Sequence, residues 1–171
     1  MESNFEFSEI AVDHARNPRN CGSLESYNGC ARITGPCGDT MESWIDVVDE
    51  QIRSVAFTTD GCGSSRACGS MATTLAAGKT LEEAACIEQH DILDALGGFP
   101  EEAQHCALLA ANTLRAACAD YEKDHRQPGF RGGRSRTGKA FRQIHASMLG
   151  FLGISSSDSQ REAYSQGGRA Q

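Results

Sequence analysis

Residues 58–71, which read TTDGCGSSRACGSM, connect an expected strand to an expected helix through a turn that contains Cys62. The glycine on each side of Cys62 gives the backbone access to conformations that other residues disfavour, and it leaves little bulk around the sulfur. A thiol at the start of a helix lies near the positive end of the helix dipole, which favours the thiolate. Because the thiolate binds metals and attacks electrophiles, this turn predicts a functional cysteine where a sheet meets a helix.

A small antiparallel sheet is expected before this turn. Three segments read as strands, and they are residues 29–34, 40–48 and 52–59. Residues 49–51 can form a tight turn between the last two. In the middle strand one face carries alternating residues: Met41, Ser43, Ile45 and Val47. A sheet of this size needs helices on one face for stability, so the pattern predicts an α+β fold with the ligand loops at one end.

Helices account for the rest of the expected domain, at residues 5–16, 64–77, 80–87, 91–96 and 101–123. N-caps are expected at Ser8 and at Ser64 or Ser65, because these hydroxyls can accept hydrogen bonds from the first helical turn. Thr80 and Glu83 have the spacing of a capping box. The last helix has a stripe of residues that is expected to be buried: Ala107, Ala110, Leu114, Ala117 and Tyr121.

The composition is that of a globular protein. The chain of 171 residues is long enough for one domain with a buried core, and 39% of its residues are hydrophobic and 23% charged. No apolar run is long enough to cross a membrane, so no membrane span is expected. The acidic N-terminal segment MESNFEFSEI lacks the basic region and apolar run of a secretory signal. These features predict a cytoplasmic protein.

The net charge of −7 is unevenly distributed along the chain. Residues 1–124 have 8 Lys or Arg and 21 Asp or Glu, which gives a net charge of −13. Residues 125–171 have 8 Lys or Arg and 2 Asp or Glu, which gives +6. The difference predicts an acidic domain at residues 5–124 and a basic, largely disordered tail at residues 125–171. In the tail, residues 125–137 read as a flexible linker and residues 139–152 as a basic amphipathic helix. One Arg-Gly-Gly unit favours a solvated linker over a nucleic-acid-binding segment.

The eight cysteines need an explanation other than disulfides, because thiols inside cells are kept reduced. No CxxC pair occurs, which counts against a zinc ribbon and against a thioredoxin-type motif. Metal binding, redox chemistry and burial in the core remain open. Cys68 is interpreted as a buried helix residue, with a reserve ligand or redox partner for Cys62 as the alternative. Four others are interpreted as structural: Cys21, Cys30, Cys86 and Cys118.

Three cysteines stand in turns or near a helix start, beside other residues that bind metals. Cys37 and Asp39 flank a glycine in the turn PCGD, and Cys62 follows the third expected strand. Strands that end side by side would bring both turns to one edge of the sheet. Adjacent helical residues point about 100° apart, so His105 and Cys106 reach one site only at the end or edge of a helix. This set of thiolates, carboxylate and imidazole suits iron, zinc or an iron–sulfur cluster.

Five motifs occur along the chain: NPRNCGS at residues 17–23, CGD at 37–39, GCGS at 61–64, GKTLEEA at 78–84 and HCALLA at 105–110. Together they resemble the iron–sulfur cluster assembly scaffold family, of the IscU and NifU N-terminal type, over roughly residues 5–124. The resemblance implies an α+β fold with a three-stranded antiparallel sheet. It also implies a scaffold that receives sulfur from a cysteine desulfurase, combines it with iron into a transient 2Fe-2S cluster and passes the cluster to apo-proteins.

The resemblance implies roles for individual residues. Cys37, Cys62 and Cys106 would ligate the cluster, or zinc in the cluster-free form. Asp39 would be the acidic residue that keeps the cluster labile, and His105 would be a neighbouring alternative ligand. Either Cys106 or Cys37 would accept the incoming sulfur as a persulfide.

One segment departs from the family pattern. Bacterial members often have an LPPVK segment just before the His-Cys pair, which recruits a dedicated chaperone. Residues 98–103 read GFPEEA in this chain, so an acidic helix start replaces a basic motif. This departure argues against a partnership with that chaperone.

Two other functions fit the same residues. A structural or storage zinc protein would use the three cysteines to bind a tight, colourless metal. A thiol enzyme with Cys62 or Cys106 as nucleophile would need a nearby histidine and a third group that orients it. His105 adjoins Cys106, but no orienting group is evident in the sequence. The preferred interpretation is therefore a scaffold without catalytic turnover.

Overall fold

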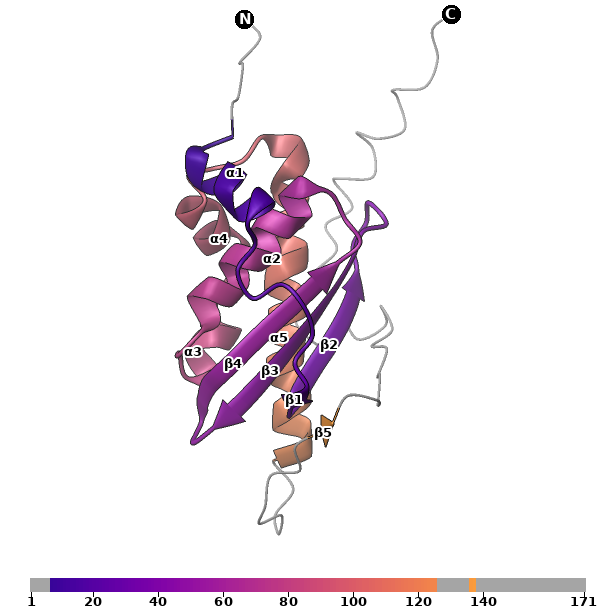
Figure 1. The fold of residues 1–171 in the computed structure, drawn as a ribbon, viewed down its shortest axis with the longest axis vertical. Coiled ribbons are helices and arrows are strands. Elements are labelled where there is room, and N and C mark those ends of the chain that lie inside the picture. Colours follow the sequence, from indigo (N-terminus) through magenta and orange to yellow (C-terminus); the bar gives the residue numbers. More distant parts are fainter. Residues whose placement is uncertain (1–6, 126–135, 138–171) are drawn as a thin grey trace, which may run out of the picture.

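A three-stranded antiparallel sheet backed by helices forms the domain (Figure 1). The computed structural model describes residues 7–125 and 136–137. The elements in chain order are α1 (Glu9–Arg16), β1 (Ser26–Tyr27), β2 (Gly29–Thr34), β3 (Thr40–Val48), β4 (Gln51–Thr59), α2 (Gly63–Ala76), α3 (Leu81–Ala85), α4 (Gln89–Ala95), η1 (Glu101–Ala103), α5 (Gln104–His125) and β5 (Arg136–Thr137). The predicted α+β class is confirmed. The three predicted strands correspond to β2, β3 and β4, and β4 begins one residue earlier than predicted.

The sheet order β2-β3-β4 follows the chain, and both pairs are antiparallel. β3 and β4 are joined by a two-residue turn in which Asp49 and Glu50 have φ of 51° and 62°. Positive φ at both positions is the geometry of a type I′ turn, whose twist suits a hairpin. The predicted alternation of β3 is confirmed, because the four residues of its inner face are each at most 4% exposed: Met41, Ser43, Ile45 and Val47.

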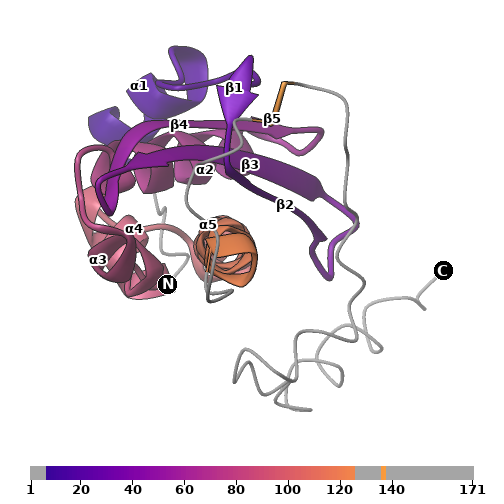
Figure 2. The same ribbon diagram turned by 90° about the horizontal axis from the view of Figure 1, so that it is seen from below.

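Helices α2 and α5 pack against the inner face of the sheet (Figure 2). α5 contacts β2 and β3, whereas α2 contacts β4. The close approach of α2 to β4 depends on Gly69, since a Cβ atom there would lie 2.4 Å from the ring of Phe57. Phe57, Ile45 and Leu114 are among the fully buried side chains of the core. α3 and α4 pack beside α5, so the predicted arrangement with helices on one face is confirmed.

α2 begins earlier than predicted, and its cap is the functional cysteine itself. The sequence predicts Ser64 or Ser65 as the N-cap, but the helix starts at Gly63 and Cys62 occupies the cap position. The physical reason is that the Cys62 carbonyl accepts a hydrogen bond from the backbone N–H of Arg66 at 3.0 Å. The helical ladder therefore begins at Cys62, and both serines lie inside the first turn.

The other helix boundaries differ from the predicted ones by a few residues. α1 begins at Glu9 rather than four residues earlier, directly after the predicted cap Ser8. α3 has the predicted capping box of Thr80 and Glu83. α5 begins at Gln104, because the turn before it is the 3-10 helix η1. Of the helices in the described residues, none combines the length and apolar character needed to cross a bilayer.

α1 contacts two separate parts of the domain. His14 is buried, and its Nδ1 atom lies 2.8 Å from Ser70 Oγ in α2. At the other end of α1, the ring of Phe7 packs edge-on against Phe99, with ring centroids 5.0 Å apart. α1 therefore braces both α2 and the segment that leads into α5.

Two short strands lie outside the main sheet. β1 pairs with β5 in an antiparallel arrangement, although the sequence analysis predicts no strand at residues 26–27 and a flexible linker at residues 125–137. Strands of two residues leave no periodic pattern in the sequence, and both predictions are wrong for these residues. His125 is the last residue of α5 rather than the first of the tail. The rest of the predicted tail, including the predicted helix at residues 139–152, lies outside the described residues.

Candidate metal centre

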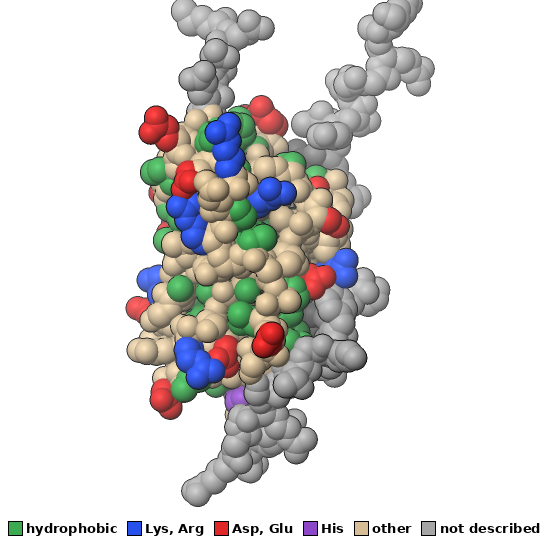
Figure 3. Space-filling model, in the orientation of Figure 1, with side chains coloured by type: hydrophobic (Ala, Val, Ile, Leu, Met, Phe, Trp, Pro, Cys, Tyr) green, Lys and Arg blue, Asp and Glu red, His purple; other side chains and the backbone are tan. Residues whose placement is uncertain are grey.

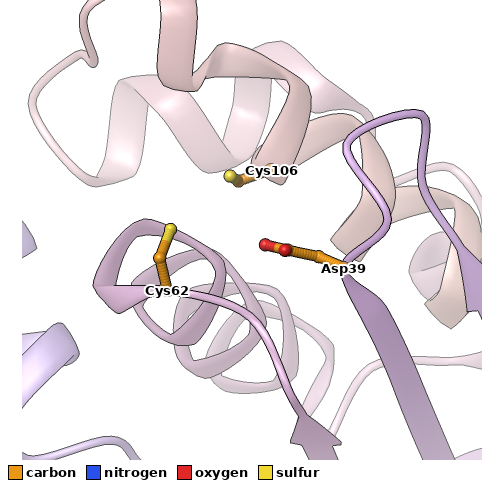
Figure 4. A group of neighbouring side chains, drawn as sticks. All are labelled: Asp39, Cys62 and Cys106. Carbon is orange, nitrogen blue, oxygen red and sulfur yellow. The ribbon is translucent and has the colours of Figure 1, made fainter.

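Three donor side chains converge beyond the end of the sheet that is drawn uppermost in Figure 1. Asp39 lies on the turn between β2 and β3, Cys62 caps α2, and Cys106 lies in the first turn of α5. One donor atom from each residue lies within 4.8 Å of the other two. Figure 4 shows the three side chains pointing into one space from three different elements. This spacing suits a single metal ion held by two sulfurs and one oxygen.

Antiparallel pairing explains why the two turns meet. β3 begins where β4 ends, and Thr40 is tied to Asp60 by two hydrogen bonds. The backbone N–H of Thr40 donates to Asp60 Oδ1 at 2.6 Å, and the backbone N–H of Asp60 donates to the Thr40 carbonyl at 3.2 Å. Asp39 directly precedes Thr40, and Cys62 is two residues after Asp60. The sheet therefore fixes the position of both turns relative to each other.

Ser65 occupies the space between the three donors, and the sequence interpretation missed this role. Its side chain is fully buried, and its hydroxyl donates to Asp39 Oδ2 at 2.6 Å. The Ser65 Oγ atom also lies 3.4 Å from Cys106 Sγ and 3.9 Å from Cys62 Sγ. The signal in the sequence is the spacing of three between Cys62 and Ser65, which puts both on one face at a helix start.

The two glycines around Cys62 have different surroundings. A Cβ atom on Gly61 would lie 2.3 Å from Asp39 Oδ2 and 2.6 Å from Ser65 Oγ. A Cβ atom on Gly63 would meet nothing closer than the Ala15 Cβ atom at 3.9 Å. The absence of a side chain at Gly61 therefore leaves the room that the Asp39 carboxylate occupies, whereas the space at Gly63 is open.

Two of the predicted ligands lie outside this cluster. Cys37 is exposed on the β2–β3 turn, and its sulfur does not belong to the group of donors found among the described residues. His105 Nε2 lies 3.6 Å from Cys106 Sγ, so its imidazole adjoins the cluster through that thiol. The structure thus brings together Asp39, Cys62 and Cys106, and it leaves Cys37 and His105 at the margin.

A family model, the NifU-like N terminal domain, matches residues 6–127 of the chain. The chain belongs to this family. It is 44% identical over 116 residues to the iron-sulfur cluster assembly scaffold protein IscU 1 of Archaeoglobus fulgidus, covering 67% of this chain and 76% of the relative. It is 40% identical over 121 residues to the scaffold protein IscU of Escherichia coli, covering 68% and 94%. The crystal structure of the N-terminal NifU-like protein from Brucella abortus has a similar fold, with a TM-score of 0.55, 19% identity and coverage of 68% and 94%.

The two clustered thiols of this NifU-like domain have opposite electrostatic environments. Partial burial raises the pKa of Cys62, but hydrogen bonds led by those from the backbone N–H groups of Ser65 and Ser64 outweigh it, so the pKa lies below its usual value. Burial raises the pKa of Cys106 to about 11 although the Ser65 hydroxyl lies 3.4 Å from its sulfur, and the charges of Cys62, Cys37 and Asp39 add to the rise. At neutral pH the metal-free domain therefore keeps the Cys106 thiol protonated.

Cys68 of the NifU-like domain belongs to the core. Its side chain is 0% exposed and lies outside the group of converging donors found in the described residues. Burial raises the pKa of Cys68 well above its usual value, and the nearby thiols Cys106 and Cys62 raise it further. This environment favours the buried helix residue over the reserve ligand. Of the remaining cysteines, Cys30 and Cys118 are buried, whereas Cys21 and Cys86 are exposed.

Proposed function

We propose that this chain is a scaffold on which a labile 2Fe-2S cluster is assembled and then passed to apo-proteins. The observation that carries the proposal is the convergence of Asp39, Cys62 and Cys106 within 4.8 Å at one end of the sheet. Membership of the NifU-like family and the names of the IscU relatives support the same function. The iron and sulfide are cargo in this proposal, and the chain has no catalytic turnover of its own.

The proposed ligands of the cargo are Cys37, Cys62 and Cys106, with Asp39 as the acidic ligand and His105 as an alternative to it. A carboxylate beside thiolates combines a hard ligand with soft ones, which leaves one position that a recipient protein can replace. Exposure of Cys62 and Cys37 gives access to the cluster from solvent. Cys37 lies on a turn that contains Gly38 at φ 91°, so a change in this turn can bring the third thiolate to the site.

Zinc is the proposed occupant of the cluster-free form, because the three clustered donors are spaced for one ion and zinc accepts sulfur and oxygen ligands. A thiol enzyme is disfavoured. Cys106 has a neighbouring imidazole at 3.6 Å, but its side chain is buried and its raised pKa opposes thiolate formation. Cys62 has the lowered pKa of a nucleophile, but its hydrogen-bond partners among the described residues are Ser65 and Ser64 rather than a histidine.

The proposed partners are a cysteine desulfurase and recipient apo-proteins in the cytoplasm, where thiols stay reduced. An LPPVK-recognising chaperone is not proposed, because Glu101 and Glu102 are exposed before the His-Cys pair and Phe99 is turned into the core. Nucleic acid is not proposed either. Figure 3 shows acidic and basic side chains interspersed over one face rather than gathered in a basic patch. The proposed domain covers residues 5–124 and the proposed tail residues 125–171, and the end of the family match at residue 127 lies close to this boundary.

Anaerobic reconstitution of the full chain with iron and sulfide tests the function. Visible absorption and transfer to an apo-ferredoxin are measured for the wild type and for Cys37→Ala, Cys62→Ala and Cys106→Ala. We expect a coloured, transferable cluster that each substitution abolishes, whereas Cys86→Ala, at an exposed cysteine outside the site, leaves it unchanged. A protein that stays colourless while it holds zinc tightly would identify a zinc protein instead.

A further inference from the structure

The Ser65 hydroxyl is placed to control one oxygen of the Asp39 carboxylate. Ser65 has a single hydroxyl proton, and the contact with Asp39 Oδ2 at 2.6 Å is much shorter than the contacts with Cys106 and Cys62 at 3.4 and 3.9 Å. A hydrogen bond to an ionised acceptor is also about twice as strong as one between neutral groups. The proton therefore points at Asp39, and full burial of Ser65 leaves no water to compete for it.

Gly61 leaves the room that this hydrogen bond needs. The position that a Cβ atom would take on Gly61 lies 2.3 Å from Asp39 Oδ2 and 2.6 Å from Ser65 Oγ. The Asp39–Ser65 hydrogen bond thus runs through space that any side chain at position 61 would fill. This hydrogen bond uses one lone pair of Oδ2, so it favours metal binding through one carboxylate oxygen over chelation through both.

We propose that Ser65 is a positioning residue that holds Asp39 as a single-oxygen ligand of the metal cargo. The inference rests on the proposed function, since it assumes that Asp39 ligates the cargo. A ligating carboxylate is commonly hydrogen-bonded by a neighbouring group that fixes its orientation, and loss of such a group typically costs roughly 10–100-fold in metal affinity. Ser65 combines this role with a position inside the cluster, so the hydroxyl fixes the carboxylate without occupying solvent-exposed surface.

The consequence for the cargo is a ligand that is both oriented and replaceable. A carboxylate limited to one oxygen binds less firmly than one that chelates through both, so an incoming ligand has only one metal–oxygen bond to displace. Without Ser65, the side chain of Asp39 is free to turn away from the thiols, because Asp39 is only half buried and residues 36–38 before it are exposed. The carboxylate then loses its fixed orientation, and the site holds the metal more weakly.

Cobalt(II) binding to the full chain tests this positioning role, because cobalt reports thiolate ligands and coordination geometry in separate absorption bands. Affinity is measured anaerobically against a competing chelator for the wild type, Ser65→Ala and Gly61→Ala. We expect each substitution to weaken cobalt binding roughly 10–100-fold and to change the ligand-field bands, while the thiolate charge-transfer band at saturation persists. Gly61→Ala reaches the same result by a different route, since its Cβ atom displaces the carboxylate.

Two matched controls separate this effect from a general loss of structure. Gly63→Ala adds the same methyl group on the other side of Cys62, where the nearest atom is 3.9 Å away. Thr73→Val removes another buried hydroxyl from α2, one that donates only to carbonyls of its own helix. Both controls should bind cobalt as the wild type does. If Ser65→Ala proves unfolded by circular dichroism, Gly61→Ala decides the question.

A double-mutant cycle with Asp39→Ala gives the sharpest outcome. Once Asp39 is absent, Ser65→Ala should have no further effect on cobalt affinity. An equal loss with and without Asp39, or wild-type affinity and ligand-field bands in both Ser65→Ala and Gly61→Ala, would overturn the inference alone. A wild type that shows no thiolate–cobalt band would instead overturn the proposed ligand set, and the inference with it.

Discussion

Cys62 and Cys106 each lie at the start of a helix and point into the same space, yet their thiols have opposite chemistry. Cys62 is exposed at the N-cap of α2, where hydrogen bonds from Ser65 and Ser64 overcome partial burial and lower its pKa. Cys106 is 1% exposed in α5, where burial raises its pKa to about 11. A helix start therefore does not determine the state of a thiol. The balance between burial and hydrogen bonding does.

The difference suggests an order of events when metal enters. The exposed Cys62, whose pKa is lowered, meets the ion first, and the buried Cys106 must lose a proton before it can bind.

α1 supports the two helices unequally as well. It contacts α2 through the buried pair His14 and Ser70, but it reaches the segment before α5 through the half-exposed Phe7.

Alkylation of the metal-free protein tests the contrast most strongly. Iodoacetamide reacts with thiolates, so at pH 8 we expect Cys62 to react at least about 100-fold faster than Cys106, from the pKa difference and the burial of Cys106. The rate at Cys62 should level off as the pH passes its lowered pKa, whereas the rate at Cys106 should still rise at pH 10. Peptide mass spectrometry measures both. Equal rates at pH 8 would remove the contrast.

The pH dependence of zinc affinity tests the protonated state of Cys106. Binding must displace the Cys106 proton, so affinity should rise about tenfold per pH unit from this group alone, up to its pKa of about 11. Below the pKa of Cys62, that thiol adds a second proton and a steeper slope. Competition with a chelator of known proton affinity measures the slope between pH 6 and 9. A plateau that begins by pH 8 would show that Cys106 is already a thiolate.

Acid should destabilise the contact between α1 and α2 by protonating His14. Burial lowers the pKa of His14, and the charge of Arg19 lowers it further, so the fold favours the neutral imidazole. Stability should therefore be complete above about pH 6.5 and should fall as the pH drops towards the folded-state pKa. Urea unfolding measures the free energy of unfolding at pH 7.5 and at pH 5.5, and the decrease between the two should be smaller in His14→Gln than in the wild type. At pH 7.5 the substitution itself should lower the free energy of unfolding by about 1 kcal/mol, because it disturbs the buried hydrogen bond. His90→Gln, at an exposed histidine, is the control and should leave the pH dependence intact.

Loss of the ring contact between Phe7 and Phe99, before α5, should have the smallest effect on stability. Phe7→Ala removes an edge-on ring pair with Phe99, which is expected to cost about 0.5–1.5 kcal/mol, because Phe7 is already 42% exposed. Urea unfolding at neutral pH measures the loss. Ile10→Ala, at an exposed apolar residue within α1, serves as the comparison and should cost less. A larger loss in Ile10→Ala than in Phe7→Ala would show that the ring contact is not what braces the α5 side.

The sequence predicts the elements better than it predicts the site. Strands β2, β3 and β4 follow from local alternation and turn residues, and the capping box of Thr80 and Glu83 is equally local. The pairing of β1 with β5 joins segments about a hundred residues apart and leaves no periodic signal. Within the turn PCGD, spacing does not decide which side chain points inward, so Asp39 joins the cluster and Cys37 does not. The spacing of three from Cys62 puts Ser65 on the same face of α2, but its hydrogen bond to Asp39 depends on a turn from another part of the chain, which no local pattern encodes.

Iron K-edge X-ray absorption of the reconstituted full chain tests the central claim most directly, because it identifies the atoms bound to iron. The claim is that Asp39 ligates the iron together with cysteine thiolates. We expect a first shell of sulfur with a minor oxygen or nitrogen component in the wild type, and loss of that component in Asp39→Cys. A wild-type shell of sulfur alone, or an oxygen or nitrogen component that persists in Asp39→Cys, would contradict it.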